Sequence, residues 1–139
     1  MNVRIAVVSL RAEDVPTTAH FYRDVLELPL APHHAAWPHF DLGGTYLVVL
    51  QGRPVPAQDS TSPRFPLIAF EVNDLDTAAD RLREHAVELP WGVEEDASSR
   101  WVMFCDPAGN LIELVQFKYA ANHPAHGSGA RSATHHAAH

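Results

Sequence analysis

Hydrophobic and polar positions follow two different periods in the first third of the chain. The run Ile5–Leu10 is apolar and rich in β-branched residues, which predicts a strand. A helix is predicted after Asp14, a residue that can cap it, because apolar residues then recur three or four positions apart. They are Val15, Ala19, Tyr22 and Leu26. Three short strands are expected next, at Leu28–Ala31, Trp37–Leu42 and Tyr46–Leu50.

The same order of elements returns in the second half of the chain. A strand is predicted at Leu67–Val72 and a helix from Asp74 to about His85. Three strands are then expected at Val87–Leu89, Trp101–Cys105 and Leu111–Gln116. Each half therefore has the order βαβββ, which indicates an internal repeat.

Individual residues repeat along with the elements. Asp14 corresponds to Asp74, and Gly44 corresponds to Gly109 when the end of each half is aligned. We therefore predict an α+β fold built from two βαβββ modules. The predicted divisions are a first module at 1–51, a linker rich in Pro and Ser at 52–64, a second module at 65–118, and a flexible His- and Ala-rich tail at 119–139.

Composition and charge narrow the classes of partner. The chain has 139 residues and a formal net charge of −7, so nothing favours binding to nucleic acid or to an anionic membrane. Its single cysteine gives no disulfide framework. No apolar run approaches the length of a membrane span, and the first residues lack the features of a signal peptide. We expect a cytoplasmic protein.

Three stretches carry a resemblance to a known family. They are Glu13-Asp14-Val15 followed by Phe21–Leu26, the segment Ala69–Leu75, and the segment Phe104–Leu114 with its Asp-Pro-Ala-Gly-Asn turn. In this order they resemble the vicinal oxygen chelate superfamily, which includes glyoxalase I, bleomycin-resistance proteins, fosfomycin-resistance enzymes and extradiol dioxygenases. The resemblance runs from about Ile5 to Phe117. One departure is Glu27, where the family usually has glycine.

The resemblance implies eight strands that curl into a cup, with the ligand on the concave side and the helices on the convex side. Period-two alternation then assigns faces. In the first strand Val7 and Ser9 are expected toward the cup and Leu10 toward the helix. In the closing strands Tyr46 and Val48, and likewise Glu113, are expected toward the cup.

Metal-dependent members of the superfamily are implied to carry ligands at four cup positions. Here these positions hold Val7, Val48, Leu67 and Glu113. A divalent ion needs about three convergent His or carboxylate ligands, so we expect neither a metal nor another cofactor. A loop that folds His33, His34 and His39 onto an ion is a weaker alternative, since loop histidines are more often polar surface.

An apolar cup suits the binding of an organic molecule, and aromatic side chains in its wall or rim would stack on a planar ligand. The predicted ligand-binding residues are Val7, Ser9, Trp37, Phe40, Tyr46, Val48, Leu67, Trp91, Trp101 and Glu113.

Three functions follow from these observations. The first is a metal-independent, homodimeric protein of the bleomycin-resistance type that confers resistance by sequestering an antibiotic or another bulky, partly aromatic natural product. The second is a metal-independent isomerase or lyase with Glu113 as acid or base. The third is a regulatory or scaffolding module with a vestigial cup.

Overall fold

The computed structural model describes residues 1–31, 37–54, 64 and 66–118. The chain divides into two compact units. The N-terminal unit comprises Met1–Pro56 together with the turn Asp106–Asn110, and the C-terminal unit comprises Ala57–Cys105 and Leu111–His139. Most of the predicted linker, together with His33, His34 and the predicted tail, lies outside the described residues.

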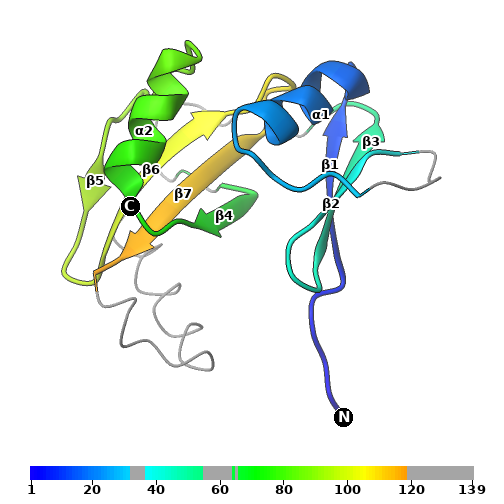
Figure 1. Ribbon diagram of the computed structural model, residues 1–139, viewed down its shortest axis with the longest axis horizontal. Coiled ribbons are helices and arrows are strands. Elements are labelled where there is room, and N and C mark those ends of the chain that lie inside the picture. The colour runs from blue at the N-terminus through cyan, green and yellow to red at the C-terminus, as the bar shows by residue number, and fades with distance from the viewer. Residues whose placement is uncertain (32–36, 55–63, 65, 119–139) are drawn as a thin grey trace. The chain divides into compact units, whose positions relative to one another are not determined.

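The N-terminal unit has one helix and a three-stranded sheet (Figure 1). Its elements are β1 (Val7–Ala12), α1 (Val15–Asp24), β2 (His39–Asp41) and β3 (Tyr46–Gln51). The strand order is β1-β3-β2, with β1 parallel and β2 antiparallel to β3. The strand predicted at Leu28–Ala31 is reduced to a single bridge between Leu30 and Phe40. Pro29 has no N–H group to donate to a ladder, which accounts for the short pairing.

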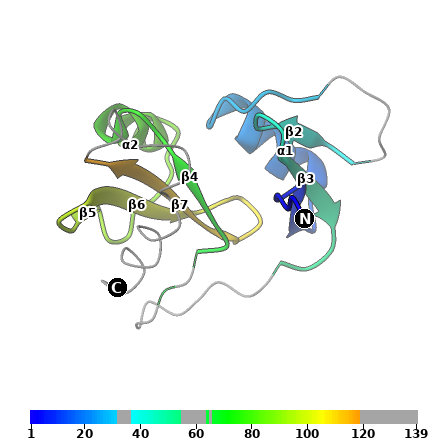
Figure 2. The same ribbon diagram turned by 90° about the horizontal axis from the view of Figure 1, so that it is seen from below.

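The C-terminal unit has one helix and a four-stranded sheet. Its elements are β4 (Ile68–Glu71), α2 (Leu75–Glu84), β5 (Glu94–Glu95), β6 (Ser99–Cys105) and β7 (Leu111–Phe117). The order is β4-β7-β6-β5, and α2 covers one face of this sheet (Figure 2). The predicted α+β architecture of curled mixed sheets is confirmed. The prediction of a strand at Val87–Leu89 is wrong, because the unit's second strand is the two-residue β5 instead.

The repeat is visible in the way both helices begin. The Asp14 carboxylate accepts hydrogen bonds from the backbone and side chain of Thr17, and the Asp74 carboxylate accepts the same pair from Thr77. These bonds stabilise the ionised form and lower the pKa of both carboxyl groups. The cap predicted at Asp14 is therefore present, and Asp74 caps the second helix in the same way.

Both helices are also followed by a left-handed residue that is not glycine. Glu27 has a φ of 58° and Ala86 a φ of 59°. A side chain in this region of backbone conformation normally costs about 1–2 kcal/mol. The chain thus retains a left-handed turn at Glu27, the position where the resemblance leads one to expect glycine.

Each unit has a core between its helix and its sheet. In the N-terminal unit it includes Tyr22 from α1 and Phe40 from β2, whose ring centroids lie 6.2 Å apart, and both side chains are fully buried. In the C-terminal unit Leu75 and Leu82 from α2 are buried over the sheet. This packing orients the strands, because each sheet presents one face to a helix and the other away from it.

Candidate functional site

The face of the N-terminal sheet that points away from α1 carries most of the residues predicted for a ligand. We call it the N-terminal far face. Leu47 and Val49 point to the core and are fully buried, so their neighbours in β3 point the opposite way. Strand register adds the partners of these neighbours in β1 and β2. The far face consists of Val7, Ser9, Arg11, His39, Asp41, Tyr46, Val48 and Leu50.

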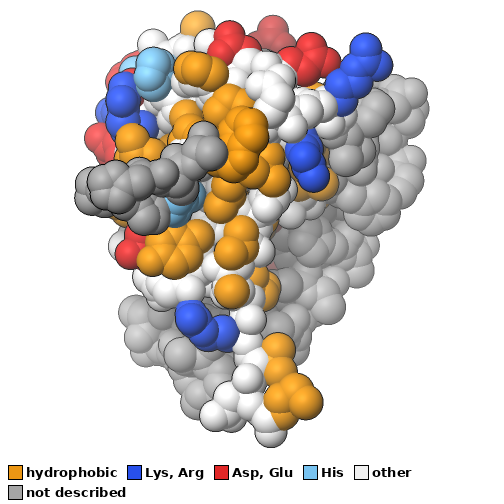
Figure 3. Space-filling view, turned by 90° about the vertical axis from the view of Figure 1, so that its right-hand side faces the viewer, with side chains coloured by type: hydrophobic (Ala, Val, Ile, Leu, Met, Phe, Trp, Pro, Cys, Tyr) orange, Lys and Arg blue, Asp and Glu red, His pale blue; other side chains and the backbone are white. Residues whose placement is uncertain are grey.

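Apolar side chains on this face reach solvent. Val7 is 53% exposed and Tyr46 38% exposed, and Ile5, in the segment before β1, is also exposed. Hydrophobic side chains of this unit gather on the side of the molecule that Figure 3 shows. Exposed apolar surface of this kind typically marks a place where another molecule binds.

Aromatic and polar groups border the apolar part of the far face. The His39 ring meets the Tyr46 ring edge-on, with centroids 5.7 Å apart. The Nδ1–H of His39 donates to the carbonyl oxygen of Trp37 at 3.0 Å, and Trp37 is 39% exposed. A planar molecule on this face would therefore meet aromatic rings beside hydrogen-bonding groups.

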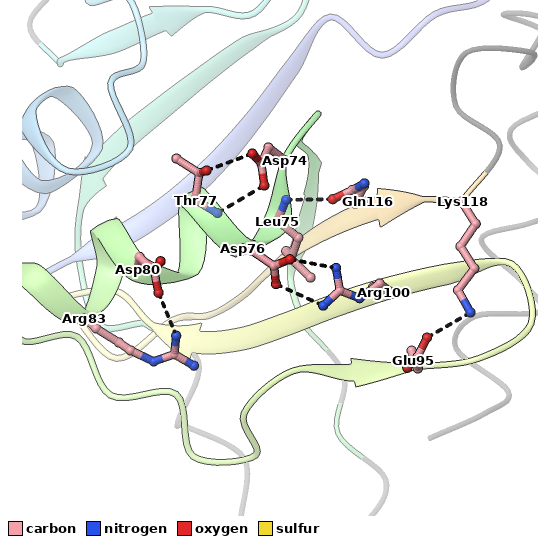
Figure 4. A network of polar contacts seen from close by, with 10 residues as sticks. All are labelled: Asp74, Leu75, Asp76, Thr77, Asp80, Arg83, Glu95, Arg100, Gln116 and Lys118. Carbon is pink, nitrogen blue, oxygen red and sulfur yellow. Dashed lines mark hydrogen bonds and ion pairs between the residues drawn. The ribbon is translucent and has the colours of Figure 1, made fainter.

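The corresponding face of the C-terminal sheet can be identified from polar contacts around α2. The Gln116 side chain accepts a hydrogen bond from the Leu75 N–H, and Arg100 pairs with Asp76, as Figure 4 shows. Gln116 and Arg100 therefore point toward α2, and alternate residues of β6 and β7 point away from it. We call this second surface the C-terminal far face. It includes Trp101, Met103, Leu111, Glu113, Val115 and Phe117.

The C-terminal far face is buried. Trp101 is 2% exposed and Met103 is fully buried, and with three apolar residues of β7 they form a core cluster. Trp91 packs against this cluster. Glu113 lies between Met103 of β6 and Ala69 of β4, is fully buried, and has both carboxylate oxygens shielded from solvent.

The four positions at which the resemblance implies metal ligands fall in both units. Val7 and Val48 lie on the N-terminal far face, Glu113 lies on the C-terminal far face, and Leu67 precedes β4 and is 48% exposed. Within the described part of the chain, no group of three or more His, Cys, Asp or Glu side chains is arranged to hold a metal ion. The expectation of a metal-free site stays a prediction.

Two of the predicted ligand-binding residues lie in cores. Phe40 pairs with Leu47, points to α1 and packs against Tyr22, which places it away from the N-terminal far face. Trp101 belongs to the buried cluster of the C-terminal unit. Val7, Ser9, Tyr46 and Val48 do share one face, as the alternation predicted.

A buried polar network in the N-terminal unit has no counterpart in our predictions from the sequence. The Tyr22 hydroxyl donates to the Asp106 carboxylate at 2.7 Å, and the Asn110 amide donates to the same oxygen at 2.9 Å. Asn110 also donates to the backbone oxygen of Arg11, which ties the turn to β1. Burial, with the charge and hydrogen bond of Asp106, raises the pKa of Tyr22 well above its usual value. The Asp-Pro-Ala-Gly-Asn motif located this turn, but its burial against α1 depends on tertiary packing.

No helix among the described residues is long and apolar enough to cross a membrane.

Several solved structures share the fold. An antibiotic binding protein from a Streptomyces species is 22% identical, with a TM-score of 0.68 over 84% of this chain and 98% of that one. A lactoylglutathione lyase from Agrobacterium tumefaciens is also 22% identical, with a TM-score of 0.65 over 84% and 95% of the two chains. A glyoxalase/dioxygenase from Nostoc punctiforme is 20% identical, with a TM-score of 0.67 over 82% and 90%.

Sequence comparison identifies the family directly. A search of curated proteins gave no significant match. The profile of one family, however, matches residues 4–114, which is most of the chain. The protein belongs to the Glyoxalase/Bleomycin resistance protein/Dioxygenase superfamily.

Proposed function

We propose that the protein binds a bulky, partly aromatic small molecule, such as an antibiotic, and confers resistance by sequestering it without metal or cofactor. The observation that carries this proposal is the N-terminal far face, where Val7 and Tyr46 present apolar surface to solvent. Such a surface holds an organic molecule through burial and ring stacking. It offers little to activate a substrate, because Val7 and Val48 have no donor atoms where metal-dependent relatives are expected to carry ligands.

Similarity to an antibiotic binding protein supports the same function. That protein shares this fold over nearly its whole length. The similarity to a lactoylglutathione lyase is almost as great, so the choice between binder and enzyme depends on the residues of this chain. At the four positions Glu113 is accompanied only by Val7, Val48 and Leu67, which supply no second acid, base or metal ligand, and this favours binding over catalysis.

Fluorescence titration tests the proposal with a panel of planar aromatic antibiotics. Binding should quench tryptophan emission. Trp37→Ala, at an exposed tryptophan of the N-terminal unit, should weaken binding by about 1–3 kcal/mol, whereas Trp101→Ala, in the buried cluster of the C-terminal unit, is the comparison variant and should leave the affinity unchanged if it folds. Circular dichroism must accompany each titration to show that the variant is folded. A neutral effect of folded Trp37→Ala would place the site elsewhere.

The second candidate function is a metal-independent isomerase or lyase that uses Glu113. Prolonged incubation of the wild type with a bound ligand, followed by mass spectrometry, separates the two functions, because a binder returns the ligand unchanged. Glu113→Gln sharpens the test. A loss of about 1–3 kcal/mol in affinity would make Glu113 a ligand contact, whereas intact affinity with abolished conversion would make it a catalytic base.

Two further properties belong to this proposal. We expect a homodimer, because β1 and β4 are edge strands and the far face leaves apolar surface exposed. Sedimentation that shows a concentration-independent monomer at micromolar protein would reject the dimer.

We also expect no stoichiometric metal. Elemental analysis of a chain ending near Lys118 would contradict this by finding one tightly held transition metal per molecule.

A further inference from the structure

A three-residue cluster lies beside the C-terminal far face. The Arg64 guanidinium lies over the Trp91 ring, 4.1 Å from its centroid. Both terminal nitrogens of Arg64 donate to the Glu94 carboxylate, at 3.0 and 2.8 Å. The arrangement therefore combines stacking on an aromatic face with a two-pronged ion pair.

This pair is less exposed than the other arginine–carboxylate pairs among the described residues. The Arg64 and Glu94 side chains are 12% and 23% exposed, whereas those of Arg83 and Asp80 are 52% and 70% exposed. A shielded ion pair is screened less by water and salt. Removing one partner leaves the other charge poorly compensated. Glu94 therefore needs a cation at this position.

The surroundings of Arg64 have the chemistry of a cation-binding site. An electron-rich indole face recognises a flat cation from above, and a carboxylate beside it accepts two parallel N–H bonds. Trp91 in turn packs on the cluster that contains Trp101, so its ring is held against the C-terminal far face. The net charge of −7 favours the approach of a cation.

We propose that Trp91 and Glu94 form a binding site for planar organic cations, such as aromatic amidines, which Arg64 occupies as an internal ligand. These residues lie in the C-terminal unit, so this site goes beyond the function proposed for the N-terminal far face and is tested independently of it. A bound amidinium would stack on Trp91 and pair with Glu94 after Arg64 has swung away. Arg64 thereby lowers the apparent affinity, because only the vacated fraction of molecules binds.

Calorimetric titration with benzamidine tests the site. Arg64→Met vacates it while keeping an apolar side chain of similar length, and should bind benzamidine about tenfold more tightly than the wild type, or better. Combining Arg64→Met with Glu94→Gln, or with Trp91→Leu, should remove that gain. Arg83→Met is the matched control, since Arg83 also pairs with a carboxylate but is exposed, and should leave the affinity unchanged.

Three results would overturn the inference. The first is an affinity for benzamidine in Arg64→Met no higher than in the wild type. The second is a gain that persists with Glu94→Gln. The third is wild-type binding of benzoate that Arg64→Met abolishes, which would make Arg64 an anion contact. If Arg64→Met fails to fold, Arg64→Lys replaces it in the test. A lysine side chain stacks on Trp91 and pairs with Glu94 less well than arginine, so this variant should bind benzamidine more tightly than the wild type.

The proposed function is tested separately, with neutral planar antibiotics and the N-terminal far face. If the wild type binds no neutral antibiotic but Arg64→Met still binds benzamidine more tightly than the wild type, the proposed function is refuted and the cation site stands.

Discussion

The two far faces have the same origin in the sequence pattern and opposite exposure in the structure. On the N-terminal sheet Val7 and Tyr46 reach solvent, whereas on the C-terminal sheet Met103 and Glu113 are fully buried. Alternation along a strand determines which residues share a face, but not whether that face is covered. The two halves therefore differ in what their far faces can contact. Apolar residues of this face are open to solvent in the first half, whereas those of the second half are packed in a core.

The largest expected effect is a difference in stability between two tryptophan variants, one in each unit. Trp101→Ala empties a site in the buried cluster and should lower the free energy of unfolding by about 3–5 kcal/mol. Trp37→Ala, at a residue 39% exposed, should lower it by about 1 kcal/mol or less. Urea unfolding followed by circular dichroism measures both. Equal losses would show that the two tryptophans do not differ in the way their exposure indicates.

A second pair of variants compares the two turns that the repeat relates. Asp106 is 4% exposed and accepts from Tyr22 and Asn110, whereas Asp41 is exposed and accepts from the backbone of its own turn. Asp106→Ala leaves buried donors without an acceptor and should cost about 2–4 kcal/mol of stability. Asp41→Ala should cost under about 1 kcal/mol. A comparable cost for both, measured by urea unfolding, would contradict this contrast.

The raised pKa of Tyr22 predicts a loss of stability at high pH. The fold favours the neutral phenol, so its contribution is complete below the ordinary tyrosine pKa of about 10 and declines as pH rises toward the folded-state pKa. In that interval the loss approaches about 1.4 kcal/mol per pH unit. The free energy of unfolding of the wild type and of Tyr22→Phe, measured from pH 8 to 11, isolates the loss that Tyr22 causes. Parallel pH profiles would show that Tyr22 does not cause the decline.

The smallest effect concerns the left-handed residues after the two helices. Glu27→Gly and Ala86→Gly relieve backbone strain at equivalent places. Part of the gain is offset by the greater freedom of glycine in the unfolded chain, so each should stabilise by about 0.5–1 kcal/mol. Thermal unfolding would detect this as a rise in melting temperature. A fall would mean that the replaced side chain contributes more than its strain costs.

Much of the fold was predictable because it rests on local signals. The capped helices at Asp14 and Asp74 and the long strands β3 and β7 have clear periods, and the repeat confirmed their order. β5 was missed because two glutamates carry no strand signal, and its pairing with β6 depends on the neighbouring strand.

The candidate site was predictable only in part. Alternation correctly grouped Val7 with Tyr46 and Val48. Phe40 was nevertheless predicted for the ligand site, although it alternates with the polar His39 and Asp41 and lies under α1. The contact of Arg64 with Trp91 joins residues 27 positions apart, with β4 and α2 between them, and no periodic pattern reports such a pair.

Two-dimensional NMR of backbone amides, with the antibiotic that quenches fluorescence most strongly, tests the central claim most directly. We expect the amides of Val7, Ser9, Tyr46 and Val48 to shift together and to saturate with one dissociation constant. Amides of α2 should stay in place. Shifts confined to α2, or absent from all four residues while the antibiotic is bound, would contradict a ligand site on the N-terminal far face.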